Sequence, residues 1–553
     1  MDYFQNQINM FLLKNHILKD PICDWFNIND YINNGLYEKD KPSHYKNLIL
    51  TESQKYKQNL FEKIITISGL HDINMINKNH NETERAIVNN YPIIINGSLY
   101  NPDENLNIKC DLIIRFDYFK KIFPLVSNIP FNLLYHDPMD YMLISISYSS
   151  LKFKIDLMDI NNEGIIPYKK CSLYAFQKAF YKIMRYKPHC FILGKGYQFK
   201  NDILPRKNFI CYFKINDCII TKFNNALNWI LYIKDNYLNM NIYPNPTHKE
   251  LYPNMNYKES DWEIEKHKLA IKIKEITLVW NISYNERCNY VQNGITCWND
   301  NRLINNLKES KKKDIQERMI HMNKNNDILI YPRKNVSNEF KNALEMDGIF
   351  FDVESFLTFD QKEDLFNTEV IPEEPIIAIL GFIYNNNYYE YTIQDYTIQE
   401  EERIIQLFSD KLHDIINDNI INDNILNVYH WGHAEYSYFN YIYKKYPHIP
   451  FPKLNLINIL DHFRSEPVIV QGVFKFGLKE IGNALYKNGL INTTWGKNDN
   501  GLDTMIRFKE ICLERNKNIP LKRYNEISEI IEYNMIDCRV LFEIVEVLRK
   551  IYI

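Results

Sequence analysis

The spacing of apolar residues changes along the chain and separates helical stretches from strand-rich ones. Residues 1–95 show mainly the spacing of amphipathic helices, clearest over 53–68. From Pro92 onward, short apolar runs bounded by turn residues predict strands. We expect strands over 91–101, 108–119 and 141–157, then a helix over 168–185 and a strand over 190–197.

The second half of the chain begins with helical spacing and then alternates. Helices are predicted over 225–238, 260–276 and 305–322, and a turn-rich stretch around Pro332 leads into the last domain. That domain opens with a strand over 348–352 and continues with paired strands over 375–385 and 387–397. Further elements then alternate: a helix over 400–416, a strand over 425–432, a helix over 434–446, a strand over 453–460, and helices to the end. This order predicts a mixed α/β protein with several domains.

Acidic residues at the start and the end of the last domain suggest a metal site. Asp352 and Glu354 alternate on the predicted strand, so both side chains leave the same face of the sheet. Asp537 lies on a predicted helix, and Tyr533 precedes it by one helical turn on the same face. Carboxylates that meet at one point repel each other unless divalent cations neutralise them, and oxygen ligands suit Mg²⁺ or Mn²⁺. Two such ions can hold the attacking and leaving oxygens of a phosphodiester, and Tyr533 could orient the attacking water.

Each acidic motif also has a structural explanation. Asp-x-Glu is common at exposed strand ends, and Tyr-x-x-x-Asp on a helix is often a surface pair. The two motifs together, in this order and with a plausible α/β domain between them, favour a nuclease fold.

Composition and charge narrow the class of protein. The 553 residues carry a formal net charge of −3, which does not favour a general nucleic-acid coat but permits a local basic groove. Ten cysteines include no C-x-x-C pair, which argues against a zinc ribbon or an iron–sulfur cluster. No apolar run approaches the roughly 18 residues of a membrane span, and the first residues lack the features of a signal peptide. We therefore expect a soluble, intracellular protein with no membrane contact.

The motifs and their order resemble a family of predicted RecB-type nucleases found in bacteria and in large DNA viruses. The likeness runs from about Glu82 to the end and is strongest over 428–439, 473–491 and 529–544. The composition resembles a giant-virus version, which implies the host cytoplasm or the virion as location. Family members join a PD-(D/E)XK nuclease domain, a helical linker and a YprB-like ribonuclease H-like domain of the DEDDy exonuclease type. The resemblance implies domains over 1–215 (with a helical extension), 216–339 and 340–553.

In the last domain the resemblance implies four ligands for two Mg²⁺ or Mn²⁺ ions and one residue that orients water. These are Asp352, Glu354, Glu435 and Asp537, with Tyr533 for the water. Glu435 stands where many relatives have Asp, and it fits an ordinary acidic residue at a helix N-terminus equally well. Next to it, His430 and His433 could contact substrate, although such residues more often pack locally. The family commonly has Asp at Asn458; if that Asp supports metal binding, activity is in doubt, whereas Asn can serve as a cap.

The N-terminal domain departs from the family pattern. Asp111 fits the first acidic position of a PD-(D/E)XK site, but the next strand carries Ser145 and Ser147 where an acid and a lysine are expected. Serine replaces neither a metal-binding carboxylate nor a cation that stabilises charge. We therefore expect a degenerate nuclease domain, retained for structure or for binding nucleic acid.

The linker carries a weaker signal. Residues 275–300 resemble a helix-hairpin-helix region, but the hairpin reads Asn281-Ile282-Ser283 without the expected glycines, so a helical spacer is favoured.

Together these features predict a metal-dependent nuclease. We expect it to hydrolyse DNA or RNA, as a 3′–5′ exonuclease acting through its last domain. A catalytically inactive protein that binds nucleic acid or serves as structure is the alternative, and a nuclease active only in a partner complex is a third hypothesis.

Overall fold

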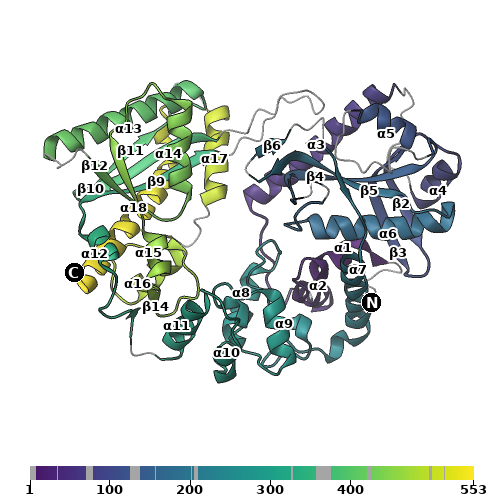
Figure 1. The fold of residues 1–553 in the computed structure, drawn as a ribbon, viewed down its shortest axis with the longest axis horizontal. Coiled ribbons are helices and arrows are strands. Elements are labelled where there is room, and N and C mark those ends of the chain that lie inside the picture. The colour runs from purple at the N-terminus through teal and green to yellow at the C-terminus, as the bar shows by residue number, and fades with distance from the viewer. Residues whose placement is uncertain are drawn as a thin grey trace. The chain divides into compact units, whose positions relative to one another are not determined.

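The computed structural model describes most of the chain, and the described residues form two compact units (Figure 1). Of the described residues, the first unit contains those within 8–42 and 46–273, and the second contains 43–45 and those within 274–356 and 375–553. The three-domain division implied by the family resemblance stays a prediction. The described residues are 8–33, 35–69, 79–124, 137–155, 157, 159–200, 202–204, 209–325, 328–356, 375–419, 425–496, 501–515, 517 and 519–553.

The first unit is built on a mixed sheet. Among its described residues, seven strands follow the order β1-β3-β4-β5-β6, with β2 also paired to β3 and β7 to β5. β3 and β4 are antiparallel neighbours, whereas β4 and β5 run parallel. The elements are β1 (Ile8–Asn9), α1 (Met10–Ile17), α2 (Ile22–Asn33), α3 (His44–Ser68), α4 (His80–Val88), β2 (Ile93–Asn101), β3 (Leu106–Arg115), α5 (Phe116–Ile122), β4 (Tyr141–Phe153), α6 (Ile166–Met184), β5 (His189–Phe199), β6 (Asp202–Leu204), β7 (Cys211–Phe213), α7 (Asp217–Asn236) and α8 (Glu263–Ile273).

Most strands of this sheet lie where the apolar runs predict them, but two predicted strands are too long. The strand expected over 141–157 ends at Phe153. The expected strand over 108–119 ends at Arg115, and α5 begins at Phe116. The buried side chains of α5, Phe116, Phe119 and Ile122, recur every third residue, which is helical rather than strand spacing. The strand prediction was therefore wrong for 116–119, because it read a helical apolar pattern as the end of a strand.

The second unit is built on a second mixed sheet. Its described residues form five strands in the order β11-β10-β9-β12-β13, with β9 antiparallel to β10 and parallel to β12. The elements are α9 (Tyr284–Gln292), α10 (Asn301–Asn306), α11 (Lys313–Lys324), β8 (Ile330–Tyr331), α12 (Asn338–Glu345), β9 (Gly348–Phe356), β10 (Ile376–Tyr384), β11 (Asn387–Thr392), α13 (Ile398–Asn419), β12 (Ile425–His430), α14 (Ala434–Lys445), β13 (Lys453–Asn458), α15 (Ile459–Ser465), β14 (Ile469–Val470), α16 (Leu478–Lys487), α17 (Gly501–Glu514) and α18 (Asn525–Tyr552). The expected mixed α/β multidomain class is thus confirmed. No helix among the described residues combines the length and the apolar character needed to cross a membrane.

Helices cover both faces of the five-stranded sheet, and β9 supplies side chains to both cores. Phe350 packs in a core with side chains of α12, α15, α16 and α18, whereas Phe351 packs in a core with side chains of α13, α14 and α17. Because neighbouring residues of a strand face opposite sides, Asp352 and Glu354 share the face of Phe350, on which α18 lies. The alternation on β9 thus places both acids beneath α18.

Gly381 on β10 permits the close approach of α18 to the sheet. Gly381 pairs with Asp352 across the β9–β10 ladder. A Cβ atom at Gly381 would lie 1.7 Å from Oδ1 of Asn534 on α18, so only glycine fits here. This spacing lets the acidic face of β9 and the acidic face of α18 meet.

We expect Gly381→Ala to destabilise the second unit and to weaken the site together. Overpacking of this kind typically costs about 1–3 kcal/mol of unfolding free energy, measurable by denaturant unfolding followed by circular dichroism. In an Asn534→Ala background, which removes the clashing amide, Gly381→Ala should cost less unfolding free energy than it does in the wild type. An unchanged free energy in the single variant would show that α18 is not held this close to β10.

Candidate metal centre

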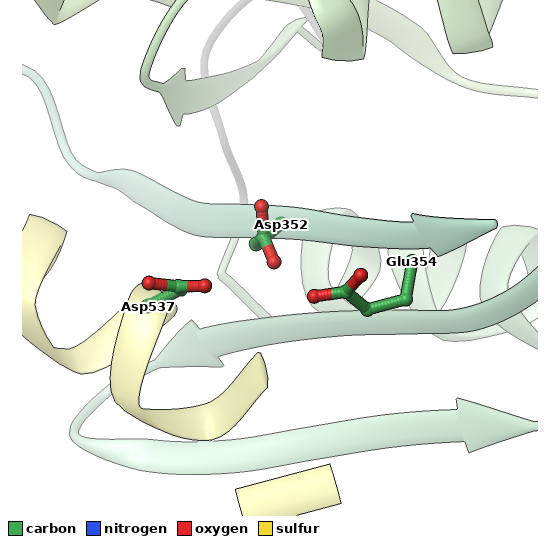
Figure 2. Close-up of side chains that lie close together, drawn as sticks. All are labelled: Asp352, Glu354 and Asp537. Carbon is green, nitrogen blue, oxygen red and sulfur yellow. The ribbon is translucent and has the colours of Figure 1, made fainter. Parts of the chain in front are cut away.

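Three carboxylates from two distant parts of the sequence converge on one point. Asp352 and Glu354 come from β9, and Asp537 comes from the middle of α18 (Figure 2). One oxygen of each lies within 4.8 Å of the others, and Figure 2 shows the three groups gathered between the strand and the helix. Asp352 and Glu354 are half-buried, and Asp537 is buried. The convergence that the spacing predicts is therefore present, and the role of these residues as ligands remains a prediction.

Glu435, the fourth predicted ligand, comes from the helix that follows the neighbouring strand β12. It lies in the first turn of α14, directly after β12, and only 6% of its surface is exposed. The negative charge of Glu435 contributes to the raised pKa of Asp352, after burial, Asp537 and Glu354. Nδ1 of the buried His430 lies 3.4 Å from Oε2 of Glu435, and neither atom has a hydrogen-bond partner among the described residues. A buried carboxylate oxygen without a hydrogen bond is costly, and a cation would satisfy it.

A cavity of about 270 Å³ opens onto this cluster. Three of the predicted ligands line it, together with Tyr533 and an apolar and aromatic wall. Its described lining consists of Phe351, Asp352, Trp431, Glu435, Leu478, Lys479, Glu480, Tyr533, Asp537 and Leu541. The acidic cluster is therefore reachable from solvent by a small group or by the end of a chain.

Two side chains that the sequence interpretation did not assign fix the acids in place. Nδ2 of Asn534 donates to Oδ2 of Asp352 over 2.8 Å, and its Oδ1 accepts from the Tyr388 hydroxyl over 2.8 Å. Nε1 of Trp495 donates to Oδ1 of Asp537 over 2.8 Å. Asn534 precedes Asp537 by three positions on a helix, so its position on the same face was open to prediction. Trp495 lies in a loop, and no local pattern places it here.

Burial and mutual repulsion shift the titration of the cluster. Burial, followed by the charges of Asp537 and Glu354, raises the pKa of Asp352 well above its usual range. Burial and the charge of Asp537 raise the pKa of Glu354 to about 8, against the opposing charge of Lys479. Burial and the nearby Asp537 also raise the pKa of Tyr533, so its hydroxyl stays protonated. At neutral pH the ionised form of the whole cluster is therefore disfavoured unless a positive charge lies near it, and this fits a site for divalent cations.

Asn458 acts as a helix cap at the end of β13. Its Oδ1 accepts from the backbone N–H groups of Leu460 and Gly432, over 3.1 Å and 3.0 Å. Its Nδ2 donates to Oδ2 of Asp461 over 2.7 Å. An aspartate here would set two carboxylates against each other, so the asparagine amide suits this position beside Asp461. His433 lies outside the cluster, with its ring largely exposed and Nε2 at 3.7 Å from Asp461.

Asp111 in the first unit has a different environment. β3 and β4 are neighbours, as expected, and Oδ2 of Asp111 accepts from Ser145 Oγ over 3.0 Å and from the backbone N–H of Ile146 over 2.7 Å. Nζ of Lys57 donates to its Oδ1 over 2.7 Å, and Nζ of Lys169 lies 3.3 Å from Ser145 Oγ. Burial alone would raise the pKa of Asp111, but the charges of Lys169 and Lys57 outweigh it and hold the pKa below its usual value. Two ammonium groups therefore balance the negative charge of this carboxylate, so that its neutralisation requires no metal ion.

Comparisons of the chain with family models, with curated proteins and with solved structures found no match.

We expect the stability of the metal-free protein to fall as the pH rises, and bound metal to counteract this fall. A carboxyl group whose pKa is raised in the folded state binds its proton more tightly there than in the unfolded chain, so its stabilising contribution is present at low pH. For Glu354 that contribution should be lost as the pH rises from about 4.5 towards about 8. Thermal unfolding in EDTA should show a larger stability loss over this range for the wild type than for Glu354→Gln.

Added Mn²⁺ should reverse this loss, because metal ions favour the ionised carboxylates. At about 100 times the dissociation constant the gain is about 2.7 kcal/mol, and it should be larger at pH 8 than at pH 5.5. Equal stabilisation by Mn²⁺ at both pH values would contradict the account.

We expect Trp495→Phe to weaken metal binding. The change keeps an aromatic ring but removes the N–H that orients Asp537, and loss of such a supporting partner typically costs roughly 10–100-fold in metal affinity. Trp229→Phe is the matched control, because Nε1 of Trp229 donates over 2.8 Å to Oδ2 of Asp24, an acid outside the site. Calorimetric titration with Mn²⁺ measures both, and equal affinities in the two variants would rule out the orienting role.

Proposed function

We propose that the second unit is a metal-dependent nuclease that hydrolyses phosphodiester bonds of DNA or RNA. In this proposal residues 340–553 form a ribonuclease H-like domain of the DEDDy exonuclease type, acting from a 3′ end as the family resemblance implies. The observation that supports it most is the convergence of Asp352, Glu354 and Asp537 within 4.8 Å, at a cavity that Glu435 and Tyr533 also line. Carboxylates so placed, with raised pKa values, are the donor set of a site for two Mg²⁺ or Mn²⁺ ions.

In this proposal different residues of the site bind the metal ions, position the ligands and orient the water. Asp352, Glu354, Glu435 and Asp537 would hold the ions, which would supply Lewis-acid stabilisation of the charge that develops on the phosphodiester. Asn534 and Trp495 keep two of these acids in fixed rotamers through their hydrogen bonds. The protonated hydroxyl of Tyr533, one helical turn before Asp537, orients the attacking water. Leu478, Leu541 and Trp431 give the open cavity an apolar wall, and low polarity beside the acids strengthens their electrostatic interactions.

For the first unit we propose a PD-(D/E)XK-like fold that has lost its catalysis. The observation that favours this is the ion pair of Asp111 with Lys57, next to Lys169 and Ser145. Ser145 and Ser147 are buried and carry no charge. The unit then contributes structure or metal-independent contact with nucleic acid.

The nuclease proposal is tested by degradation of end-labelled single-stranded DNA and RNA with Mn²⁺. Wild-type protein should shorten one or both from the 3′ end, and EDTA should stop it. Asp352→Asn should remove cleavage and stoichiometric Mn²⁺ binding, because a neutral amide replaces a central ligand. Asp111→Asn, the matched change in the first unit, should leave cleavage unchanged. Cleavage that survives Asp352→Asn and disappears in Asp111→Asn would assign the activity to the other unit.

Tyr533→Phe tests the role of the phenol. The variant keeps the packing of the ring and removes only the hydroxyl, so kcat should fall by on the order of 10–10³-fold, the usual contribution of a positioned catalytic group. KM and Mn²⁺ affinity should change little. Wild-type turnover in this variant would assign Tyr533 to packing.

A further inference from the structure

The acidic cavity lacks an obvious means of attracting a polyanion. Asp352, Glu435, Glu480 and Asp537 line it, and Glu354 adjoins it. A nucleic-acid strand carries a negative charge at every phosphate, so these acids repel the substrate that the proposed function requires. Divalent cations offset that repulsion in part, and a further cation in the cavity wall would act directly on the phosphate.

Lys479 is the cation that the described lining of this cavity contains. It lies in the first turn of α16, after Gly477. Its Nζ lies 4.6 Å from the centroid of the Tyr533 ring and 5.8 Å from that of Trp495, so two aromatic rings border the ammonium group. Those rings belong to the residue proposed to orient water and to the residue that holds Asp537.

The packing of α16 fixes this arrangement. A Cβ atom at Gly482, one turn further along the helix, would lie 2.9 Å from the Trp495 ring and 2.7 Å from Cγ1 of Val540 on α18. The glycine therefore lets Trp495 fill the space between α16 and α18. Lys479 projects from the same helix at the cavity wall, on a flexible stem that ends in a compact charge with three donors.

We propose that Lys479 binds a phosphate oxygen at the 3′ end of a single strand that enters the cavity, as a substrate-binding residue of the proposed nuclease. The inference rests on the proposed function and adds the residue that overcomes the repulsion between the acids and the substrate. Lys479 also opposes the negative charge of Glu354. In the absence of substrate its ammonium serves as counter-charge for the acids, and the incoming phosphate takes over part of that pairing.

The test compares Lys479→Gln with Lys479→Arg and with Lys487→Gln, whose exposed lysine lies in the last turn of the same helix. The probe is a 5′-labelled oligodeoxythymidylate in the presence of Mn²⁺. The measured constant is the KM for cleavage of this strand, or its Kd if the protein leaves the strand intact. Lys479→Gln should raise this constant about 10-fold, in line with a charge-assisted hydrogen bond. Lys479→Arg should stay within about threefold of the wild type, since it keeps the charge, and Lys487→Gln should match the wild type.

Two further measurements separate phosphate binding from structural support. In Lys479→Gln the salt dependence of binding should lose about 0.7 of its logarithmic slope, the share of one phosphate contact on a single strand. Mn²⁺ titrated without oligonucleotide should bind Lys479→Gln at least as tightly as the wild type, because a positive neighbour has been removed. A Lys479→Gln variant that binds oligonucleotide like Lys487→Gln overturns the inference, and so does one that loses Mn²⁺ affinity.

The same experiment keeps the two proposals apart. Wild-type protein that binds the strand and leaves it intact overturns the nuclease proposal, while the effect of Lys479→Gln on Kd still decides the role of Lys479. Wild-type protein that binds no oligonucleotide in Mn²⁺ overturns both.

Discussion

Repulsion among buried carboxylates is the constraint on which the second unit depends. Two unit charges about 4 Å apart interact by about 4 kcal/mol at an effective dielectric constant of about 20, a large part of the roughly 5–15 kcal/mol that stabilises a typical domain. The fold nevertheless brings Asp352, Glu354 and Asp537 together, because Gly381 lets α18 lie close against β10. Burial and the charge of Asp537 together raise the pKa of Glu354 to about 8, so protons offset the repulsion in the metal-free protein. In the proposed nuclease, bound metal ions would offset the same repulsion and also serve the reaction.

The first unit shows the opposite solution to the same problem. Asp111 also lies between strands and helices, but ammonium groups of Lys57 and Lys169 hold its pKa below the usual value. A carboxylate neutralised from within the chain has little affinity left for an external cation. Glu354 thus has a raised pKa among acids, whereas Asp111 has a lowered pKa because two lysines lie beside it.

The periodicity of apolar residues and the spacing of acidic ones predicted much of the second unit, because both depend on the local geometry of strands and helices. The alternation of Asp352 and Glu354 on a strand, and the helical turn from Tyr533 to Asp537, follow from backbone geometry alone. The role of Asn458 as a cap for α15, and its bond to Asp461, became visible only in the structure. Trp495 and Lys479 reach the site through the packing of α16 on α18, which is a long-range property without a local signature. The helix over 116–122 was missed because its apolar run continues directly from β3.

The central claim is that the acids of β9 and α18 form one site for two metal ions. Crystals of the protein soaked in Mn²⁺ and measured at the manganese absorption edge test it most directly. The account predicts two anomalous peaks roughly 3.5–4 Å apart, the usual spacing of two-metal sites, between Asp352 and Asp537 with Glu354 and Glu435 in reach. The same soak should place no peak at Asp111. Absence of any peak at the β9 acids, or a peak at Asp111 instead, would contradict the account.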